Sequence, residues 1–556
     1  MFFQQEPDYY RPLAYLETAP RYFPRNDPDF RKEKNLLAGK GQSIASLGHL
    51  ESAYRTDFYN TKDDENRLTD GILAQQPTYT DPAWFRFTHG MGRTILFDLG
   101  AVCAVSEFVI RLLKERVTGV SLPRKVQFSV SENGVDFECV ANLTGIRSTH
   151  DADIVQVRAK VEPAVRARFV RVYFPVTAHV YVDQIEAIGT KCADNARPVV
   201  PDAPETVLRP DRYCTAAELG GAKDVLLAYF CHEERAPLDK SAFKPFVGYL
   251  DENGKAKDTL FDGYLFLPFV AFLYDHSRKK PLNKEKWQYY MDQQFLDGKN
   301  LDALEEAAAE VADELGKPDL KLKIFFSILY PVPDQHVFGV IGGKPRDFRR
   351  LEDRIAALEW LVDEQEERFR AKGYRHLELA GYYWFTEEID YEDEQLLEMI
   401  RSITDRIRKK GLITTWIPYY GASGYDDWRN LGFDMACYQP NYAFRKDIPE
   451  QRLFDAAKTA KELGMCIELE VGGTEKWNVE HTRNYYAAGA VTGFMKDAAH
   501  MYYQDGMPGC FHAAYLSKDP FLHSMYDDTY RFIKGTYPED GFARPEGSGE
   551  SPSADA

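Results

Sequence analysis

Two glutamates lie close together in a predicted strand in the last quarter of the chain. Glu468 and Glu470 belong to the mostly apolar run Cys466–Val471. Because side chains alternate along a strand, these two carboxyl groups share one face, and Ile467 and Leu469 share the other. A carboxyl group on a buried face is costly unless it is paired. Catalysis and core pairing are the two explanations, and Glu470 is expected nearer the strand end.

A second pair of carboxylates follows another predicted strand. Glu387 and Glu388 come shortly after the run His376–Tyr383. Glycoside hydrolysis needs two carboxyl groups flanking one bond, one as acid and the other as nucleophile or base. We therefore predict Glu470 as nucleophile and Glu387 as general acid/base, with Glu388 as the alternate acid/base. The structural alternative is that Glu387 and Glu388 form the acidic first turn of a helix.

Aromatic and amide side chains occupy several other predicted strand ends. Aromatic rings offer a face that stacks on a sugar, and amides hydrogen-bond to its hydroxyl groups. Core packing is the alternative role for the same rings. The predicted sugar-binding residues are Tyr229, Tyr383, Trp384, Trp416, Tyr438, Gln439, Tyr442 and His512.

These residues lie in a region where apolar strand-like runs alternate with charged amphipathic helices. This alternation begins after Lys223 and predicts a (β/α)8 TIM barrel with the active site at the C-terminal ends of its strands. A doubly wound sheet is the alternative, but no glycine-rich nucleotide-binding motif follows any strand. The predicted strands are Asp224–Phe230, Gly263–Phe269, Leu322–Leu329, His376–Tyr383, Leu412–Tyr419, Met435–Gln439, Cys466–Val471 and Gly509–Tyr515, and the clearest helices are Leu301–Leu315, Phe348–Lys372, Asp393–Lys410 and Pro449–Leu463.

The N-terminal third has a different pattern, with short strands and turns and almost no helical period. Strands are predicted at Thr94–Gly100, Glu107–Leu112, Lys125–Val130 and Arg168–Phe174, and Asn133-Gly134 predicts a hairpin turn. This is typical of an all-β jelly-roll sandwich. The predicted domains are an N-terminal arm (1–35), the β-sandwich module (36–191), a proline-containing linker (192–222), the barrel (223–540) and a disordered tail (541–556).

Composition excludes several classes of protein. The net charge of −18 argues against nucleic-acid binding and against docking on an anionic membrane. The eight cysteines show no paired or metal-ligand spacing, which fits a reducing compartment. Because the first residues show no secretory pattern, we expect a cytoplasmic protein. No motif predicts a catalytic metal or cofactor.

Residues 36–190 resemble a discoidin, or coagulation factor five/eight type C, domain. The matching pieces, in order, are Leu68–Gly71, Trp84, Phe97–Gly100, Pro123–Val126, Ser131–Gly134 and Phe169–Val172. The resemblance implies a galactose-binding-like jelly roll that often carries a structural Ca²⁺ near the Asp-Gly turn. Asp70 is therefore the candidate calcium ligand. The resemblance does not fix the ligand of this module, because some members bind protein or lipid, and the carbohydrate partner we expect is the substrate of the barrel.

Residues 223–536 resemble the bacterial family called domain of unknown function 4855. The matching segments are Phe261–Pro268, Leu379–Trp384 with Glu387, Trp416–Tyr420, Tyr438–Tyr442 and Ile467–Glu470. The family name implies no activity. The carboxylates after the fourth strand and in the seventh resemble those of the large barrel clan of retaining glycosidases, which is an analogy at the level of fold.

The sequence thus predicts a retaining glycoside hydrolase that acts on an oligosaccharide or glycoside. The alternative is a non-catalytic glycan-binding protein with a degenerate barrel. A polysaccharide lyase is a third hypothesis. It needs a charge neutraliser such as Arg or a metal, and no basic cluster follows the predicted strands.

Overall fold

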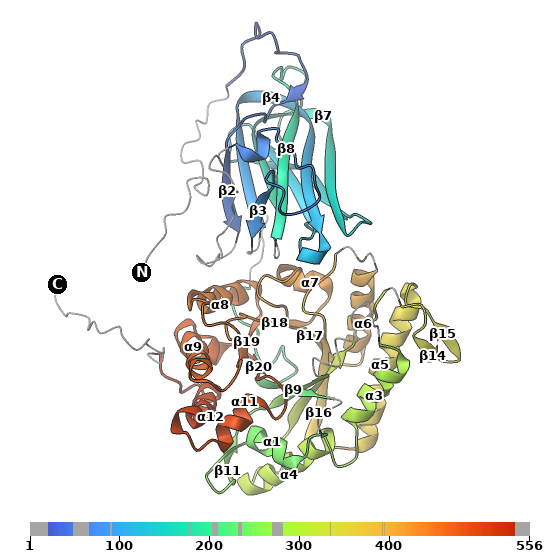
Figure 1. Ribbon diagram of the computed structural model, residues 1–556, viewed down its shortest axis with the longest axis vertical. Helices are drawn as coiled ribbons and strands as arrows, with labels where there is room; N and C mark the ends of the chain where they lie inside the picture. Colours follow the sequence, from blue (N-terminus) through green and yellow to red (C-terminus); the bar gives the residue numbers. More distant parts are fainter. Residues whose placement is uncertain are drawn as a thin grey trace, which may run out of the picture. The chain divides into compact units, whose positions relative to one another are not determined.

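The computed structural model describes residues 21–47, 66–88, 92–176, 179–202, 210–231, 236–268, 282–333, 335–391, 393 and 395–539. They form two compact units with the main boundary after Leu208. The first unit is antiparallel β-structure, and the second holds a closed barrel of parallel strands (Figure 1). Residues 1–20 of the predicted arm and the predicted tail 541–556 lie outside the described residues. No helix in the described ranges is both long enough and apolar enough to cross a membrane.

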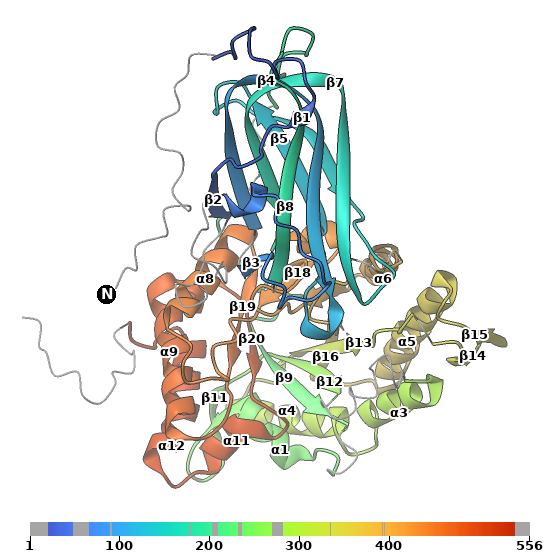
Figure 2. The same ribbon diagram turned by 45° about the horizontal axis from the view of Figure 1, so that its top comes forward.

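The N-terminal unit is an antiparallel β-sandwich built around two long strands, β4 and β7 (Figure 2). Register shifts after Asp98 and Val105 mark irregularities where β4 pairs with β7. The all-β prediction is confirmed, and two of the predicted strands are parts of the single strand β4. The strands are β1 (Lys34–Asn35), β2 (Gln42–Leu47), β3 (Phe85–Thr88), β4 (Gly92–Glu115), β5 (Lys125–Ser131), β6 (Glu138–Thr144), β7 (Ala152–Phe174) and β8 (His179–Thr190), with short 3-10 turns η3 (Arg67–Thr69) and η4 (Arg116–Thr118).

Apolar side chains fill the sandwich, and local hydrogen bonds fix its turns. The rings of Phe108 and Phe128 stack with centroids 4.7 Å apart in the buried core. The predicted hairpin joins β5 to β6, where the Ser131 hydroxyl accepts the N–H groups of Asn133 and Gly134. Gly134 has φ of 76°, a conformation that glycine adopts at little cost.

Asp70, the candidate calcium ligand, lies at the end of the η3 turn. Its Oδ1 accepts the Ile72 N–H at 2.8 Å, and its Oδ2 lies 3.1 Å from Nη1 of Arg67. The Arg67 guanidinium would compete with a divalent cation for this carboxylate, and Ca²⁺ binding by Asp70 stays a prediction. Among the described residues no group of three or more His, Cys, Asp or Glu side chains is placed to hold a metal ion.

Eight parallel strands close into a barrel in the second unit. Seven of the eight predicted strands are confirmed. The eighth prediction, Gly509–Tyr515, is wrong because that segment is a helix and the closing strand is His500–Tyr503. In order around the barrel the strands are β12 (Gly263–Pro268), β13 (Leu322–Ile328), β16 (Leu377–Trp384), β17 (Ile413–Trp416), β18 (Met435–Tyr438), β19 (Cys466–Glu470), β20 (His500–Tyr503) and β9 (Asp224–Phe230).

Helices follow the barrel strands along the chain and surround them (Figures 1 and 2). The four clearest predicted helices correspond to α4, α5, α6 and α8. Two small antiparallel hairpins, β10 (Gly248–Leu250) with β11 (Ala256–Thr259) and β14 (Gly339–Ile341) with β15 (Lys344–Arg346), interrupt a simple strand–helix alternation. The helices are α1 (Lys240–Val247), α3 (Lys284–Gln294), α4 (Leu301–Leu315), α5 (Leu351–Lys372), α6 (Leu396–Lys409), α7 (Trp428–Leu431), α8 (Gln451–Leu463), α9 (Lys476–Thr492), α10 (Phe494–Asp497), α11 (Gly509–Leu516) and α12 (Pro520–Ile533), with a 3-10 turn η6 (Tyr425–Asp427) before α7.

A bulge in β16 changes which of its side chains face the barrel interior. The pairing with β13 passes from Ile324–Leu379 to Phe325–Gly381, so Ala380 is the extra residue. Ala380 and Tyr383 therefore both join the buried cluster inside the barrel, although simple alternation would place them on opposite faces.

Polar contacts join β20 to β9 and close the barrel. His500 pairs in register with Asp224, and its Nδ1 lies 2.9 Å from Asp224 Oδ1. The Tyr502 hydroxyl donates to the same oxygen at 2.7 Å. Cys214 and Leu219, which belong to the predicted linker, lie in the core of the barrel. This part of the segment is therefore folded against the strands.

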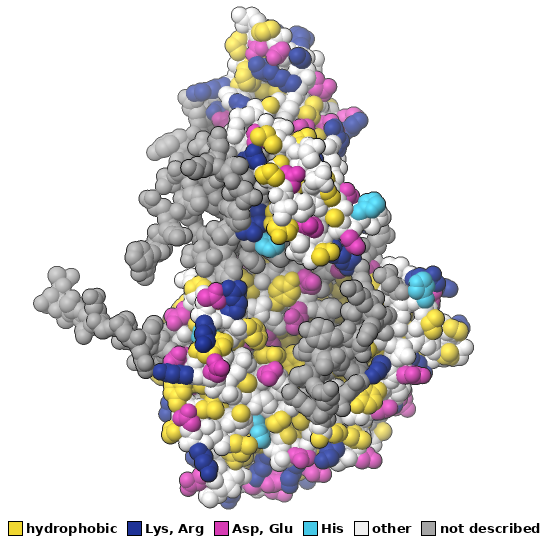
Figure 3. All heavy atoms as spheres, in the orientation of Figure 1, with side chains coloured by type: hydrophobic (Ala, Val, Ile, Leu, Met, Phe, Trp, Pro, Cys, Tyr) yellow, Lys and Arg dark blue, Asp and Glu magenta, His cyan; other side chains and the backbone are white. Residues whose placement is uncertain are grey.

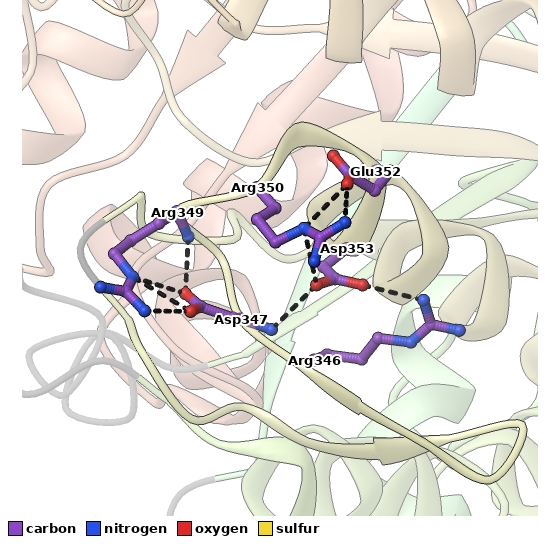
Figure 4. Close-up of polar contacts among 6 residues, drawn as sticks. All are labelled: Arg346, Asp347, Arg349, Arg350, Glu352 and Asp353. Atoms are coloured by element: carbon purple, nitrogen blue, oxygen red, sulfur yellow. Dashed lines mark hydrogen bonds and ion pairs between the residues drawn. The ribbon is translucent and has the colours of Figure 1, made fainter.

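Charged residues fix the connection from β15 into α5 (Figure 4). Nη1 of Arg346 donates to Asp353 Oδ1 at 2.9 Å, and the Asp347 N–H donates to Asp353 Oδ2 at 3.2 Å. Arg349 pairs with Asp347 and Arg350 pairs with Glu352. A carboxylate in the first helical turn thus binds backbone and side-chain donors at the positive end of the helix.

The face of the barrel unit seen in Figure 3 carries interspersed acidic and basic side chains. Between α1 and α4, Lys244 Nζ lies 2.6 Å from Glu310 and 2.8 Å from Glu314. Such surface ion pairs contribute about 0–1 kcal/mol each. The buried strands and helix faces therefore provide most of the stability.

The bulged strand gives a test of the fold. Gly381→Ala should destabilise the barrel by about 1–3 kcal/mol, a typical cost of overpacking. An added Cβ would lie 2.3 Å from the backbone carbonyl oxygen of Ile413 on β17. Urea unfolding followed by tryptophan fluorescence measures this, because all tryptophans except Trp84 lie in the barrel unit.

Gly298→Asn is the control for this variant. Gly298 has φ of 68° and no heavy atom within 4 Å of its added Cβ, and Asn tolerates this backbone conformation. We expect little change in its unfolding midpoint. If both variants unfolded at the wild-type urea concentration, the close packing of β16 on β17 would be contradicted.

Candidate active site

Glu468 and Glu470 point into the barrel from β19. Cys466, two residues earlier on the same face, belongs to the buried interior cluster with Val225 and Met435. Glu468 and Glu470 are each only 1% exposed. The alternation of side chains therefore places both carboxyl groups in the interior, as the sequence predicts.

Hydrogen-bond donors surround the carboxyl group of Glu470. The Tyr485 hydroxyl on α9 donates to its Oε2, and the Tyr442 backbone N–H donates to the same atom at 3.3 Å. Gly472 permits this approach, since a Cβ there would lie 2.6 Å from a carbonyl oxygen of the loop after β18. Burial raises the pKa of Glu470 to about 7, while Tyr485 and the backbone of Tyr442 and Asn441 oppose the rise. These donors favour the ionised form.

Glu387 follows the end of β16, which is three strands from β19 around the barrel. Gln439, just after β18, donates from Nε2 to Glu387 Oε1 at 3.3 Å. Burial is the main cause of the raised pKa of Glu387, about 7, to which the charge of Glu388 adds. The charge of Glu387 in turn raises the pKa of Glu470. The two carboxyl groups are thus close enough to interact.

Glu388, the alternate acid/base, has a different environment. Its side chain is exposed, and its Oε2 accepts the Tyr419 hydroxyl at 2.6 Å.

Glu468 is a third carboxyl group in the same cluster. Among the described residues its Oε1 has no hydrogen-bond partner. Burial is the main cause of its pKa lying well above the usual range, and the charges of Glu470 and Glu387 add to that rise. The side-chain amide of Gln439 opposes this rise in pKa.

Aromatic rings extend from this cluster toward the surface. The Tyr229 and Tyr503 rings meet edge to face at 5.6 Å, and Tyr503 meets Phe444 in the same way at 5.6 Å. Phe444 is 47% exposed, whereas Tyr383 is buried in the barrel interior. The charge of Glu387 raises the pKa of Tyr229 and Tyr383 after the larger effect of burial. Both rings therefore lie near the carboxyl groups.

Three non-glycine residues with left-handed backbone follow barrel strands. Cys231, Asn441 and Asp505 have φ of 63°, 52° and 69° and come shortly after β9, β18 and β20. Such conformations are strained for Cys231 and better tolerated by Asn and Asp, and they collect at functional sites. Their position after the strands fits a functional site at the C-terminal ends of the barrel strands.

Several predicted sugar-binding residues lie away from the carboxyl cluster. Trp384 and Trp416 are almost fully buried and contact Phe433 on the helix-facing side of the strands. Tyr438 is also buried and stacks on Tyr425. These rings leave no face open for a sugar.

The structure places His512 on α11 instead of a strand end, where its ring lies 6.2 Å from that of Phe246. Tyr442 contributes through its backbone, and its ring stacks on His481 at 4.3 Å. The side-chain amide of Gln439, another predicted sugar-binding residue, donates to Glu387 Oε1.

Sequence reasoning missed three residues near the carboxyl groups. Tyr485 lies in mid-helix, where nothing in the sequence distinguishes it from other helical tyrosines. Tyr503 ends the true eighth strand, and a search for an apolar run between α10 and the Gly509 segment could have found it. Phe444 lies in a loop that has no strand or helix pattern.

The geometry combines two carboxyl groups in different environments with an aromatic surface. Glu470 has several donors that stabilise negative charge. Glu387 has one amide donor and a raised pKa, which suits a group that holds a proton. This division of roles is what acid-assisted nucleophilic displacement requires.

Comparisons with solved structures find similarity to part of this chain. A family 32 carbohydrate-binding module of Clostridium perfringens NanJ, solved with galactose, has 13% identity and a TM-score of 0.20, and covers 28% of this chain and 98% of its own. A chitosan-binding module from Paenibacillus sp. IK-5 has 18% identity and a TM-score of 0.19, with coverage of 28% and 98%. A fucolectin from striped bass serum has 15% identity and a TM-score of 0.21, with coverage of 28% and 49%.

No protein with a curated description matches this sequence. A family model matches residues 224–531, which is more than half of the 556-residue chain and includes all eight barrel strands. The chain belongs to the family described as domain of unknown function DUF4855.

Proposed function

We propose that this protein is a retaining glycoside hydrolase with a (β/α)8 catalytic barrel. One observation carries the proposal: a carboxyl group inside the barrel and a second one just after the end of β16 interact and have different hydrogen-bond donors. Glu470 accepts the Tyr485 hydroxyl and the Tyr442 backbone N–H, and Glu387 accepts one amide. Donors stabilise the ionised form of a carboxyl group, and burial stabilises its neutral form.

In the proposed mechanism Glu470 attacks the anomeric carbon and forms a glycosyl-enzyme intermediate. The Tyr485 hydroxyl holds Oε2, which leaves Oε1 for the attack. Glu387 donates its proton to the leaving oxygen and then, as a carboxylate, removes a proton from the attacking water. Because both groups have a pKa of about 7, the required pair of one ionised and one protonated carboxyl exists near neutral pH.

The proposed substrate is an oligosaccharide or glycoside. The exposed Phe444 ring beside Tyr503 and Tyr229 offers apolar surface to the C–H face of a pyranose. We also propose that the protein works in the cytoplasm, which is supported by its eight free cysteines. Cell fractionation that recovers the native protein outside the cell would contradict that location.

Replacement of the two carboxyl groups tests the roles. Glu470→Ala should lower kcat by at least about 10³-fold on every substrate, because the displacement has no nucleophile. Glu387→Ala should lose about 10²–10⁴-fold on glycosides with poor leaving groups. It should lose much less on activated aryl glycosides, which need little protonation. Azide should partly rescue it, since azide attacks the glycosyl-enzyme without a base.

A panel of aryl glycosides and oligosaccharides measured with wild type identifies the substrate for these assays. Glu388→Ala is the matched control and should retain nearly full activity. If Glu388→Ala showed the leaving-group pattern and Glu387→Ala did not, the acid/base would be Glu388. If Glu470→Ala kept wild-type activity, or if wild type hydrolysed nothing, a glycan-binding barrel without catalysis would be favoured.

Removal of one donor tests the electrostatic assignment. Tyr485→Phe should lower kcat by about 10–100-fold, which corresponds to loss of one hydrogen bond to a charged group. Because this donor favours ionised Glu470, its loss raises the pKa of Glu470. The acidic limb of the profile of kcat against pH should therefore move to higher pH.

Tyr486→Phe is the control, since the buried Tyr486 hydroxyl also lies on α9 but pairs with Thr529 at 2.7 Å. Its profile should match the wild-type profile. An unchanged acidic limb in Tyr485→Phe would remove Glu470 from the role of nucleophile.

A further inference from the structure

A buried carboxyl group lies beneath the proposed catalytic pair and takes no part in the mechanism above. Glu468 is 1% exposed and lies two residues before Glu470 on the same face of β19. A carboxylate here would be a third negative charge in one enclosed space. The charge state of Glu468 therefore affects the neighbouring carboxyl groups of Glu470 and Glu387.

The hydrogen bonds around the cluster favour the neutral form of Glu468. In the described part of the chain its Oε1 lacks any donor. Glu470, by contrast, has the Tyr485 hydroxyl and the Tyr442 N–H. A neutral acid with one unpaired oxygen costs far less in a buried site than an unpaired carboxylate. A single negative charge in the cluster therefore belongs on Glu470.

The groups that face Glu468 support this distribution of charge. The side chains that interact electrostatically with it are carboxylic acids, cysteines, tyrosines and one amide, and burial raises the pKa of all the tyrosines among them. None stabilises a carboxylate as a cation would. They are Cys466 and Glu470 on β19, Cys437 and Gln439 on and after β18, Tyr383 and Glu387 on and after β16, Tyr229 on β9, Tyr503 on β20 and Tyr485 on α9.

Gln439 connects Glu468 to the proposed acid/base. Its Nε2 donates to Glu387 Oε1 at 3.3 Å, and the same side-chain amide lies close enough to Glu468 to lower the pKa of that carboxyl group. An amide NH2 group has two N–H donors, so one amide can serve two carboxyl groups and is then restricted in its rotation. Glu468 therefore limits where Gln439 can point, and Gln439 limits where Glu387 can point.

We infer that Glu468 is a positioning residue that remains a neutral carboxylic acid, orients Glu387 through Gln439 and leaves Glu470 as the ionised member of the cluster. The orienting role rests on the proposed glycosidase function. The charge state does not, because it follows from burial and hydrogen bonding alone. The two parts can therefore be tested separately.

The charge state is tested on the whole protein without substrate. Melting temperatures of wild type and Glu468→Gln are compared from about pH 4.5 to about pH 8.5. An unfolded Glu ionises above its ordinary pKa of 4.5. If folded Glu468 stays neutral, the wild type loses stability relative to the uncharged variant as pH rises above that value. The advantage of Glu468→Gln should thus grow by a few degrees toward the alkaline end.

Glu398→Gln is the control, because Glu398 is exposed on α6. Its difference from wild type should not change with pH. The comparison depends on the pH trend, so a constant loss of stability in Glu468→Gln does not obscure it. Parallel curves for Glu468→Gln and wild type, or an advantage that shrinks with rising pH, would overturn the inference.

The positioning role is tested with the glycoside that the wild type hydrolyses best. Glu468→Ala and Gln439→Ala should each lower kcat by about 10-fold with KM changed less than about twofold, and the double variant should lose no more than either alone. Glu468→Gln should keep kcat within about threefold and leave both limbs of the pH profile in place. If both limbs moved to lower pH in Glu468→Gln, a negative charge would have been removed and the inference would be wrong.

The two hypotheses fail in different ways. If no glycoside is hydrolysed, the proposed function fails, and the melting curves still decide the charge of Glu468. If hydrolysis is found but the losses in Glu468→Ala and Gln439→Ala multiply in the double variant, the path through Gln439 is wrong while the catalytic pair stands.

Discussion

Closure of eight parallel strands puts Glu468 and Glu470 where water scarcely reaches them, and the cost of a charge in that interior governs the site. A buried carboxyl group either finds donors or keeps its proton. The donors are unevenly distributed, since Tyr485 and the Tyr442 N–H serve Glu470 while Gln439 serves Glu387. Because of this difference in donors, Glu470 suits the ionised form and Glu387 suits the protonated form.

The backbone around the cluster is built to allow close approach. Gly472 lets the end of β19 pass against the loop after β18, and the bulge at Ala380 turns Tyr383 inward shortly before Glu387. Left-handed residues after three barrel strands add local strain. Because strain and buried carboxyl groups both lower stability, the helices and the closed strand ladder must offset this cost.

The sequence predicted the barrel well because long apolar runs alternated with helices whose periodicity was clear. It failed at Gly509–Tyr515, since a short apolar run fits a strand or a helix equally well, and the buried Cys510, Phe511 and Ala514 have helical spacing. Alternation correctly placed Glu468 and Glu470. It could not place the aromatic residues of β16, because the bulge that changes their faces leaves no clear mark in one sequence. Tyr485 was out of reach, since its contact with Glu470 arises from helix packing.

Three carboxyl groups in one enclosed site can be neither all ionised nor all neutral if the site is to work. If all three were ionised, mutual repulsion would raise the pKa of each until protons returned. If all were neutral, no nucleophile would remain. Burial raises the pKa of all three carboxyl groups, so the cluster carries fewer than three negative charges at neutral pH. A retaining displacement needs one of them on the nucleophile, and the donors around Glu470 favour that position.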